Sequence, residues 1–100
     1  MKRTNAERKK YEKIDYREHA PDTGEYEYCL FSNCNFSECD LSGIYFSDCE
    51  FLNCNLSLVT LTKTTLRDVQ FNGCKMLGVH FEHCNQFGFA VGFDRSTRQS

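Results

Sequence analysis

Residues 29–93 repeat a pattern of apolar and polar positions in blocks of five. Large apolar residues dominate the third position of each block, and small or β-branched residues fill the first position until Phe89. The third positions hold Phe31, Phe36, Leu41, Phe46, Phe51, Leu56, Leu61, Leu66, Phe71, Met76, Phe81, Gln86 and Val91. The other three positions are mostly polar or small, and Ser or Thr recurs in the fourth. This five-residue period is the feature from which we predict the fold.

A period of five matches neither common secondary structure. On an α-helix, successive fifth residues lie about 140° apart, so the apolar positions would spread around the whole helix. A flat strand would instead require alternation at every second residue. The two apolar positions of each block lie two residues apart, which puts both on one side of a short extended segment. The other three residues require a corner, so the repeat predicts a coiled chain with both apolar positions inside.

Several blocks closely resemble those of the pentapeptide-repeat family, among them residues 34–37 (CNFS), 39–42 (CDLS) and 54–57 (CNLS). Blocks of that family place a small residue two positions before a central Leu or Phe, often with Asn or Asp between them. The resemblance covers residues 29–85 and implies an all-β fold, a right-handed quadrilateral β-helix with four blocks per coil and about three to four coils. Residues twenty apart are then expected to stack at about 4.8 Å, the spacing of paired strands.

The twenty-residue step predicts four stacks of third-position residues. They are Phe31/Phe51/Phe71/Val91, Phe36/Leu56/Met76, Leu41/Leu61/Phe81 and Phe46/Leu66/Gln86. Thr64, at a first position, is expected to be buried with its hydroxyl on a backbone carbonyl, because an unsatisfied buried hydroxyl is costly. The amide of Gln86 would be costly beside Leu66 without partners, and Phe89 overfills a small-residue position. We therefore predict that the regular coil fails near residue 86.

The pattern divides the chain into four parts. Residues 1–10 are predicted to form a basic N-terminal arm, either a frayed helix or disordered, and residues 11–28 an imperfect coil that caps the solenoid. Residues 29–93 form the pentapeptide-repeat β-helix, and the polar tail 94–100 is expected to be disordered. Near the end of the coil, three phenylalanines are expected to repack as a plug or as an exposed patch, namely Phe87, Phe89 and Phe93.

All seven cysteines occupy the first position of their blocks: Cys29, Cys34, Cys39, Cys49, Cys54, Cys74 and Cys84. Their spacings are multiples of five, unlike the Cys-x-x-Cys pairs of metal sites. Their odd number argues against a disulfide framework. Because reduced cysteine behaves as a small buried hydrophobe, we interpret these residues as core, with a metal or redox role as the alternative.

The sequence offers little for catalysis. His80-Phe81-Glu82-His83-Cys84 has residue types found in metal sites, but Phe81 and Cys84 point inward by phase whereas His80 and His83 point outward. We find no nucleophile with a base and an orienting third group, and no Gly-rich phosphate loop. We therefore predict no enzyme activity, no catalytic, cofactor-binding or metal-binding residues, and no cofactor.

Composition changes this picture little. The net charge of −2 is too small to predict a nucleic-acid partner, and the N-terminal basic residues are interpreted as a solvated arm: Lys2, Arg3, Arg8, Lys9 and Lys10. No apolar run approaches the roughly 20 residues of a membrane span, and the start of the chain (MKRTNAER) lacks the apolar stretch of a signal peptide. We expect a cytoplasmic protein, where thiols stay reduced, with no membrane and no direct nucleic-acid partner.

The family resemblance implies two kinds of function. Many members are small protein-interaction or structural modules, and this is the function that we predict. Some longer members are quinolone-resistance proteins that bind DNA gyrase, a type II topoisomerase, by mimicking duplex DNA; this is the alternative, because residues 34–43 are similar to their blocks. The resemblance also implies a homodimer through the C-terminal end, at Phe87, Phe89 and Phe93. Against strong mimicry, the acids of the repeat blocks lie on all four predicted faces: Asp40 with Glu82, Asp48 with Asp68, Glu50, and Glu38.

Overall fold

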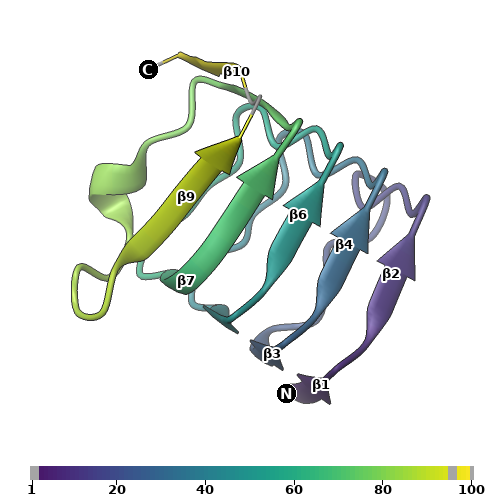
Figure 1. The fold of residues 1–100 in the computed structure, drawn as a ribbon, viewed down its shortest axis with the longest axis vertical. Coiled ribbons are helices and arrows are strands. Elements are labelled where there is room, and N and C mark those ends of the chain that lie inside the picture. Colours follow the sequence, from purple (N-terminus) through teal and green to yellow (C-terminus); the bar gives the residue numbers. More distant parts are fainter. Residues whose placement is uncertain (1–2, 95–96, 100) are drawn as a thin grey trace.

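The computed structural model describes residues 3–94 and 97–99, which wind into about five coils of parallel strands (Figure 1). The coils have four sides, and the fold is the predicted right-handed quadrilateral β-helix. The elements are β1 (Thr4–Glu7), β2 (Lys10–Glu12), β3 (Gly24–Glu27), β4 (Leu30–Ser32), β5 (Tyr45–Ser47), β6 (Glu50–Leu52), β7 (Thr65–Asn72), β8 (Lys75–Leu77), the 3₁₀ turn η1 (Phe81–His83), β9 (Ala90–Asp94) and β10 (Thr97–Gln99).

Two adjacent sides of the coil consist of strands. One parallel sheet runs across both sides in the order β1-β3-β5-β7-β6-β4-β2, and β9 also pairs with β7 (Figure 1). β7 turns the corner between the two sides, since its first residues pair with β5 and its last residues pair with β6. The other two sides are held by single bridges, such as the bridge from Asn35 to Asn55.

The corners lie at the fifth position of the blocks, and the backbone there is left-handed in most blocks. Ten non-glycine residues adopt φ values between 54° and 63° at these corners. On the sides without strands, a backbone bond closes the turn, as between the N–H of Cys39 and the carbonyl of Phe36 at 2.9 Å. Within the same block, Asn35 Oδ1 accepts the N–H of Ser37 at 2.9 Å. Such local bonds favour Asn and Asp at the second position.

The core is built from stacked rings. The ring centroids of Phe31 and Phe51 lie 4.8 Å apart at an interplanar angle of 8°, and those of Phe51 and Phe71 lie 5.2 Å apart. All three side chains are buried. These contacts confirm the twenty-residue step that the sequence predicts for this part of the chain.

The first coil begins earlier than the sequence predicts. β1 pairs with β3, with Thr4 opposite Gly24, and β2 pairs with β4. Disorder or a frayed helix in the arm 1–10 is therefore wrong for residues 4–10, while residues 1–2 lie outside the described residues. The physical reason is that Ala6 and Tyr11 keep the third-position phase. Tyr11 stacks on Phe31 at 4.9 Å, while the basic side chains of the segment stay exposed.

The last coil has a different register from the others. Phe71 pairs with Phe93 and Val69 with Val91, so partners lie twenty-two residues apart instead of twenty. The predicted stacking of Phe71 on Val91 is therefore wrong. The ring of Phe93 takes that place, 5.5 Å from the ring of Phe71. Two additional residues in the preceding loop thus restore a ring-on-ring contact that the strict period would lose.

Gln86 explains where this change occurs. Its side chain is exposed, and its Nε2 donates to the carbonyls of Cys84 at 3.0 Å and Phe81 at 3.3 Å. The predicted stacking of Gln86 on Leu66 is therefore wrong, because the amide finds its partners at the rim instead of inside the core. The prediction that the regular coil fails near residue 86 is confirmed.

The end of the chain is more ordered than the sequence predicts. β9 extends to Asp94, and β10 pairs with β8, which places Thr97 beside Lys75. Disorder throughout 94–100 is therefore wrong for residues 97–99, since the edge of β8 supplies backbone partners; residues 95–96 and 100 lie outside the described residues. The added first coil and this last partial coil raise the number from three or four to about five. Within the described part of the chain, no helix has the length and apolar character needed to cross a membrane.

The ring stack makes a quantitative prediction. Phe51→Ala removes a ring that is stacked on both sides, and it is expected to lower the free energy of unfolding by about 3–5 kcal/mol. Leu58→Ala is the matched control, because Leu58 is 57% exposed, and it should change this free energy by about 0.5 kcal/mol or less. Urea denaturation of both variants measures the difference, and equal losses would contradict the stacked core.

Candidate functional site

The seven cysteines are all buried, and their thiols are reduced. Six of the seven thiols, all but that of Cys84, donate to a backbone carbonyl of the preceding coil, as from Cys74 Sγ to Phe51 at 3.0 Å and from Cys39 Sγ to Tyr16 at 3.1 Å. The expected burial of Thr64 is confirmed, because its hydroxyl donates to the carbonyl of Leu41 at 2.7 Å in the same arrangement. The thiols therefore act as small core groups that satisfy inward-pointing carbonyls.

Burial also suppresses the reactivity of the Cys49 and Cys84 thiols. Loss of contact with water raises the pKa of Cys49 to about 12 and that of Cys84 to about 11. A reactive cysteine requires the opposite shift, since the thiolate is the nucleophile and the metal ligand. Among the described residues, no three His, Cys, Asp or Glu side chains converge in a way that could hold a metal ion.

The segment 80–84 separates into an inner and an outer set. Phe81 and Cys84 are buried, whereas His80 and His83 are exposed, as the phase predicts. His80 Nδ1 lies 3.2 Å from Glu82 Oε2, and the two histidine rings stack with centroids 5.4 Å apart. Cys84 is therefore inside the core, whereas His80, Glu82 and His83 form a cluster on the surface.

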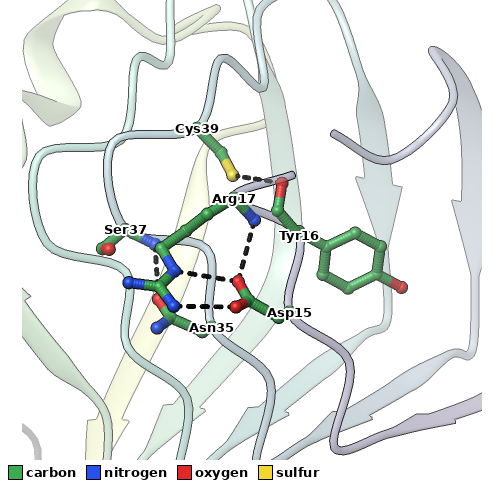
Figure 2. A network of polar contacts seen from close by, with 6 residues as sticks. All are labelled: Asp15, Tyr16, Arg17, Asn35, Ser37 and Cys39. Atoms are coloured by element: carbon green, nitrogen blue, oxygen red, sulfur yellow. Dashed lines mark hydrogen bonds and ion pairs between the residues drawn. The ribbon is translucent and has the colours of Figure 1, made fainter. Parts of the chain in front are cut away.

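A polar network borders a surface groove of about 370 Å³ between the first and second coils (Figure 2). Arg17 donates from Nε and from a terminal nitrogen to the two carboxylate oxygens of Asp15, at 2.9 and 2.8 Å. These hydrogen bonds lower the pKa of Asp15 to about 2. Because each charge of the network has its partner in the same block, the groove presents no unpaired charge from Arg17 or Asp15 to a ligand.

One side of the solenoid collects carboxylates, and we call it the acidic strand face. It is the side formed by β1, β3, β5 and the first half of β7, including the corner that follows each strand. Its five acids are Glu7, Glu25, Glu27, Asp48 and Asp68, against two guanidinium groups, Arg8 and Arg67. Glu7 and Glu27 are directly paired across neighbouring strands.

The sequence prediction missed this grouping because it considered only the acids of the repeat blocks. Those blocks do spread their acids, but β1 and β3 add three further carboxylates to a single side. The five-residue phase, continued back through Ala6, would have placed them there. Two tyrosines share the face: Tyr45 is half-buried, and Tyr28 is 53% exposed with the guanidinium of Arg8 lying 4.8 Å from its ring centroid.

The C-terminal end combines a plug with an exposed ring. Phe93 stacks on Phe71, and Phe89 packs edge-on against Phe81 with centroids 6.1 Å apart. Phe87 is 83% exposed in the loop before β9. The sequence predicts either a plug or an exposed patch for these phenylalanines. Both are present at this end, since Phe89 and Phe93 pack as a plug and Phe87 is exposed.

Known proteins resemble this chain in their repeat sequence and in their fold. A family model described as the pentapeptide repeat region matches residues 25–96. No curated protein matches the chain. Among solved structures, full-length QnrB1, described as a plasmid-mediated fluoroquinolone resistance protein, matches with a TM-score of 0.58 and 20% identity, over 91% of this chain and 47% of QnrB1. Two trypsin-treated forms of QnrB1 match at 18% identity with TM-scores of 0.41, over 91% of this chain and 54% and 51% of theirs. This chain thus spans about half the length of QnrB1, and the likeness is one of fold.

Thiol labelling tests the assignment of the cysteines. With a pKa of about 11, Cys84 holds only about one thiolate per thousand molecules at pH 8. Folded protein is therefore expected to react with a disulfide reagent far more slowly than denatured protein, with Cys39 and Cys84 first because they are the most exposed, at 6% and 5%. Mass spectrometry of the labelled peptides identifies the order. Rapid labelling of most thiols in the native protein would contradict their inward position.

Proposed function

Since this chain belongs to the pentapeptide-repeat family, we propose that it is a non-catalytic module that binds another protein through the acidic strand face. The observation that carries this proposal is the grouping of five carboxylates on one side of the molecule. Strands about 4.8 Å apart hold these groups in a fixed array. A preformed array loses little conformational entropy on binding.

The charge of the face defines the kind of partner. Five carboxylates against two guanidinium groups favour a surface rich in Lys and Arg, and such pairing speeds encounter between partners at low salt. Tyr28 and Tyr45 add amphipathic contact area of the kind enriched in protein interfaces. The partner is therefore a basic protein surface, bound in a salt-dependent way.

Two further features support a binding role without catalysis. Six of the thiols are occupied with backbone carbonyls, and the charges of Arg17 and Asp15 in Figure 2 are paired with each other. Seven buried, reduced cysteines also suit a reducing compartment, so we propose that the protein is cytoplasmic.

The alternative function is binding to DNA gyrase as a mimic of duplex DNA, together with a homodimer through Phe87, Phe89 and Phe93. The fold likeness to QnrB1 favours it, as does the acidic strand face. Its weakness is charge density. About five coils at about 4.8 Å span about 24 Å, over which duplex DNA carries about 14 phosphates, and the acidic strand face offers only five carboxylates.

Charge reversal on matched sides tests the proposal. Glu7→Lys/Glu27→Lys alters the acidic strand face, and Glu18→Lys/Glu38→Lys makes the same change of charge on the same two coils at a different corner. In affinity capture followed by mass spectrometry, proteins bound by the unmodified chain should be retained by the second variant and lost by the first. Equal capture by both variants, or equal loss, would contradict the role of this face.

The unmodified chain and the two double variants also test the alternative function, which is binding to DNA gyrase. In a gyrase supercoiling assay with and without a quinolone, gyrase binding predicts inhibition or protection by the unmodified chain and by Glu18→Lys/Glu38→Lys, but not by Glu7→Lys/Glu27→Lys. No effect of the unmodified chain, even at high concentration, would remove the alternative and leave the protein-binding proposal intact.

A further inference from the structure

Three tyrosines close the N-terminal end of the solenoid. Tyr11 stacks on Phe31 at 4.9 Å, and Tyr16 stacks on Phe36 at 4.6 Å, with interplanar angles of 11° and 13°. One face of each tyrosine ring is therefore covered by the second coil, and the opposite face is directed away from the stack. Among the described residues, no other ring stacks on these outward faces. Tyr11 is half-buried at this end, whereas Tyr16 is only 8% exposed.

The third tyrosine completes a pocket. Tyr26 lies edge-on to Tyr11, with centroids 6.3 Å apart and planes at 69°. Its partner in β1 is Ala6, and the ring of Tyr26 is only 3% exposed. Tyr11, Tyr16 and Tyr26 line a cavity of about 160 Å³ together with four consecutive residues of the following loop, namely His19, Ala20, Pro21 and Asp22.

The loop brings a negative charge to this pocket. Tyr26 Oη donates to the backbone carbonyl of Asp22 at 2.6 Å, which fixes the loop against the rings. Asp22 lines the cavity. Burial raises the pKa of Tyr11 and Tyr26, and the Asp22 carboxylate adds to both shifts, consistent with its position beside the two rings.

Two arginines of the first coil are engaged elsewhere. The guanidinium of Arg8 lies over Tyr28, on the acidic strand face. The guanidinium of Arg17 forms its two-bond pair with Asp15. Neither of these arginines therefore fills the space between the tyrosine faces.

We propose that this pocket binds a trimethylammonium group, carried by a small quaternary ammonium compound or by a trimethylated lysine of a protein. Aromatic faces attract cations that approach within about 6 Å of the ring centroid, and a nearby carboxylate adds to that attraction. Methyl groups shed water more easily than the protons of an ordinary ammonium, so they suit a pocket with apolar walls. Anions are disfavoured by Asp22 and by the negative ring faces.

NMR titration of the full chain tests this inference with two ligands of equal shape. Choline is expected to shift the ring resonances of Tyr11, Tyr16 and Tyr26. The neutral isostere of choline, with a tert-butyl group in place of trimethylammonium, is expected to bind at least about ten-fold more weakly. Equal binding of the two ligands, or no shift of these rings with choline, would overturn the proposal.

Substitutions in the pocket make the test specific. Tyr11→Leu should weaken choline binding by about ten-fold or more, whereas Tyr11→Phe, which keeps the ring face, should preserve it. Asp22→Asn should weaken binding several-fold. Tyr28→Leu is the matched control, because Tyr28 lies outside the pocket, and it should leave binding unchanged. Loss of binding in Tyr28→Leu, or unchanged binding in Tyr11→Leu, would contradict the assigned site.

A peptide with a trimethylated lysine distinguishes the two sources of the cation. Tighter binding of this peptide than of choline indicates a protein partner, and tighter binding of choline indicates a small molecule. The unmethylated peptide should bind about ten-fold more weakly than the trimethylated peptide. If methylation makes no difference, the ring faces do not recognise the ammonium group, and the inference is wrong.

Discussion

Side-chain stacking between residues twenty apart supports every other feature of this solenoid. The column from Tyr11 through Phe31, Phe51 and Phe71 places one aromatic ring on the next at 4.8 to 5.2 Å, close to the spacing of the strands that carry them. The first position must then stay small, and its thiols and hydroxyl satisfy the carbonyls that point inward. Each coil gains most of its stability through its neighbours, so the inward side chains serve to pack the core.

Function is consequently restricted to the sides and the ends. Along a side, the outward positions are free to vary, and β1 with β3 uses them to gather carboxylates beside Asp48 and Asp68. At the ends, the stack is unfinished. The C-terminal end covers Phe71 with Phe93, whereas the N-terminal end leaves the outer faces of Tyr11 and Tyr16 without a further ring among the described residues. This asymmetry is the basis for assigning different roles to the sides and to the N-terminal end.

The sequence predicted the parts of the fold that depend on the period alone. Burial of the cysteines, exposure of His80 and His83, and failure of the coil near residue 86 all follow from phase. The first coil was missed because the basic composition of residues 1–10 was given more weight than the phase of Ala6 and Tyr11. The acidic strand face was missed partly for the same reason, since Glu7 belongs to that coil, and partly because Glu25 and Glu27 lie before the repeat blocks whose acids were considered. The tyrosine pocket could not be predicted, because it depends on a loop position that no periodicity describes.

Deletion of whole coils tests the central claim most directly. Removing residues 44–63 takes out twenty residues and keeps every column in phase, so the shortened chain should retain its β-sheet circular dichroism and unfold cooperatively on heating. Removing residues 44–61 takes out only eighteen, so the first-position Thr64 falls at a third position and the exposed Arg67 falls at a first position. This longer chain should lose cooperative unfolding. If the eighteen-residue deletion folds as well as the twenty-residue deletion, the stacking step does not determine the fold.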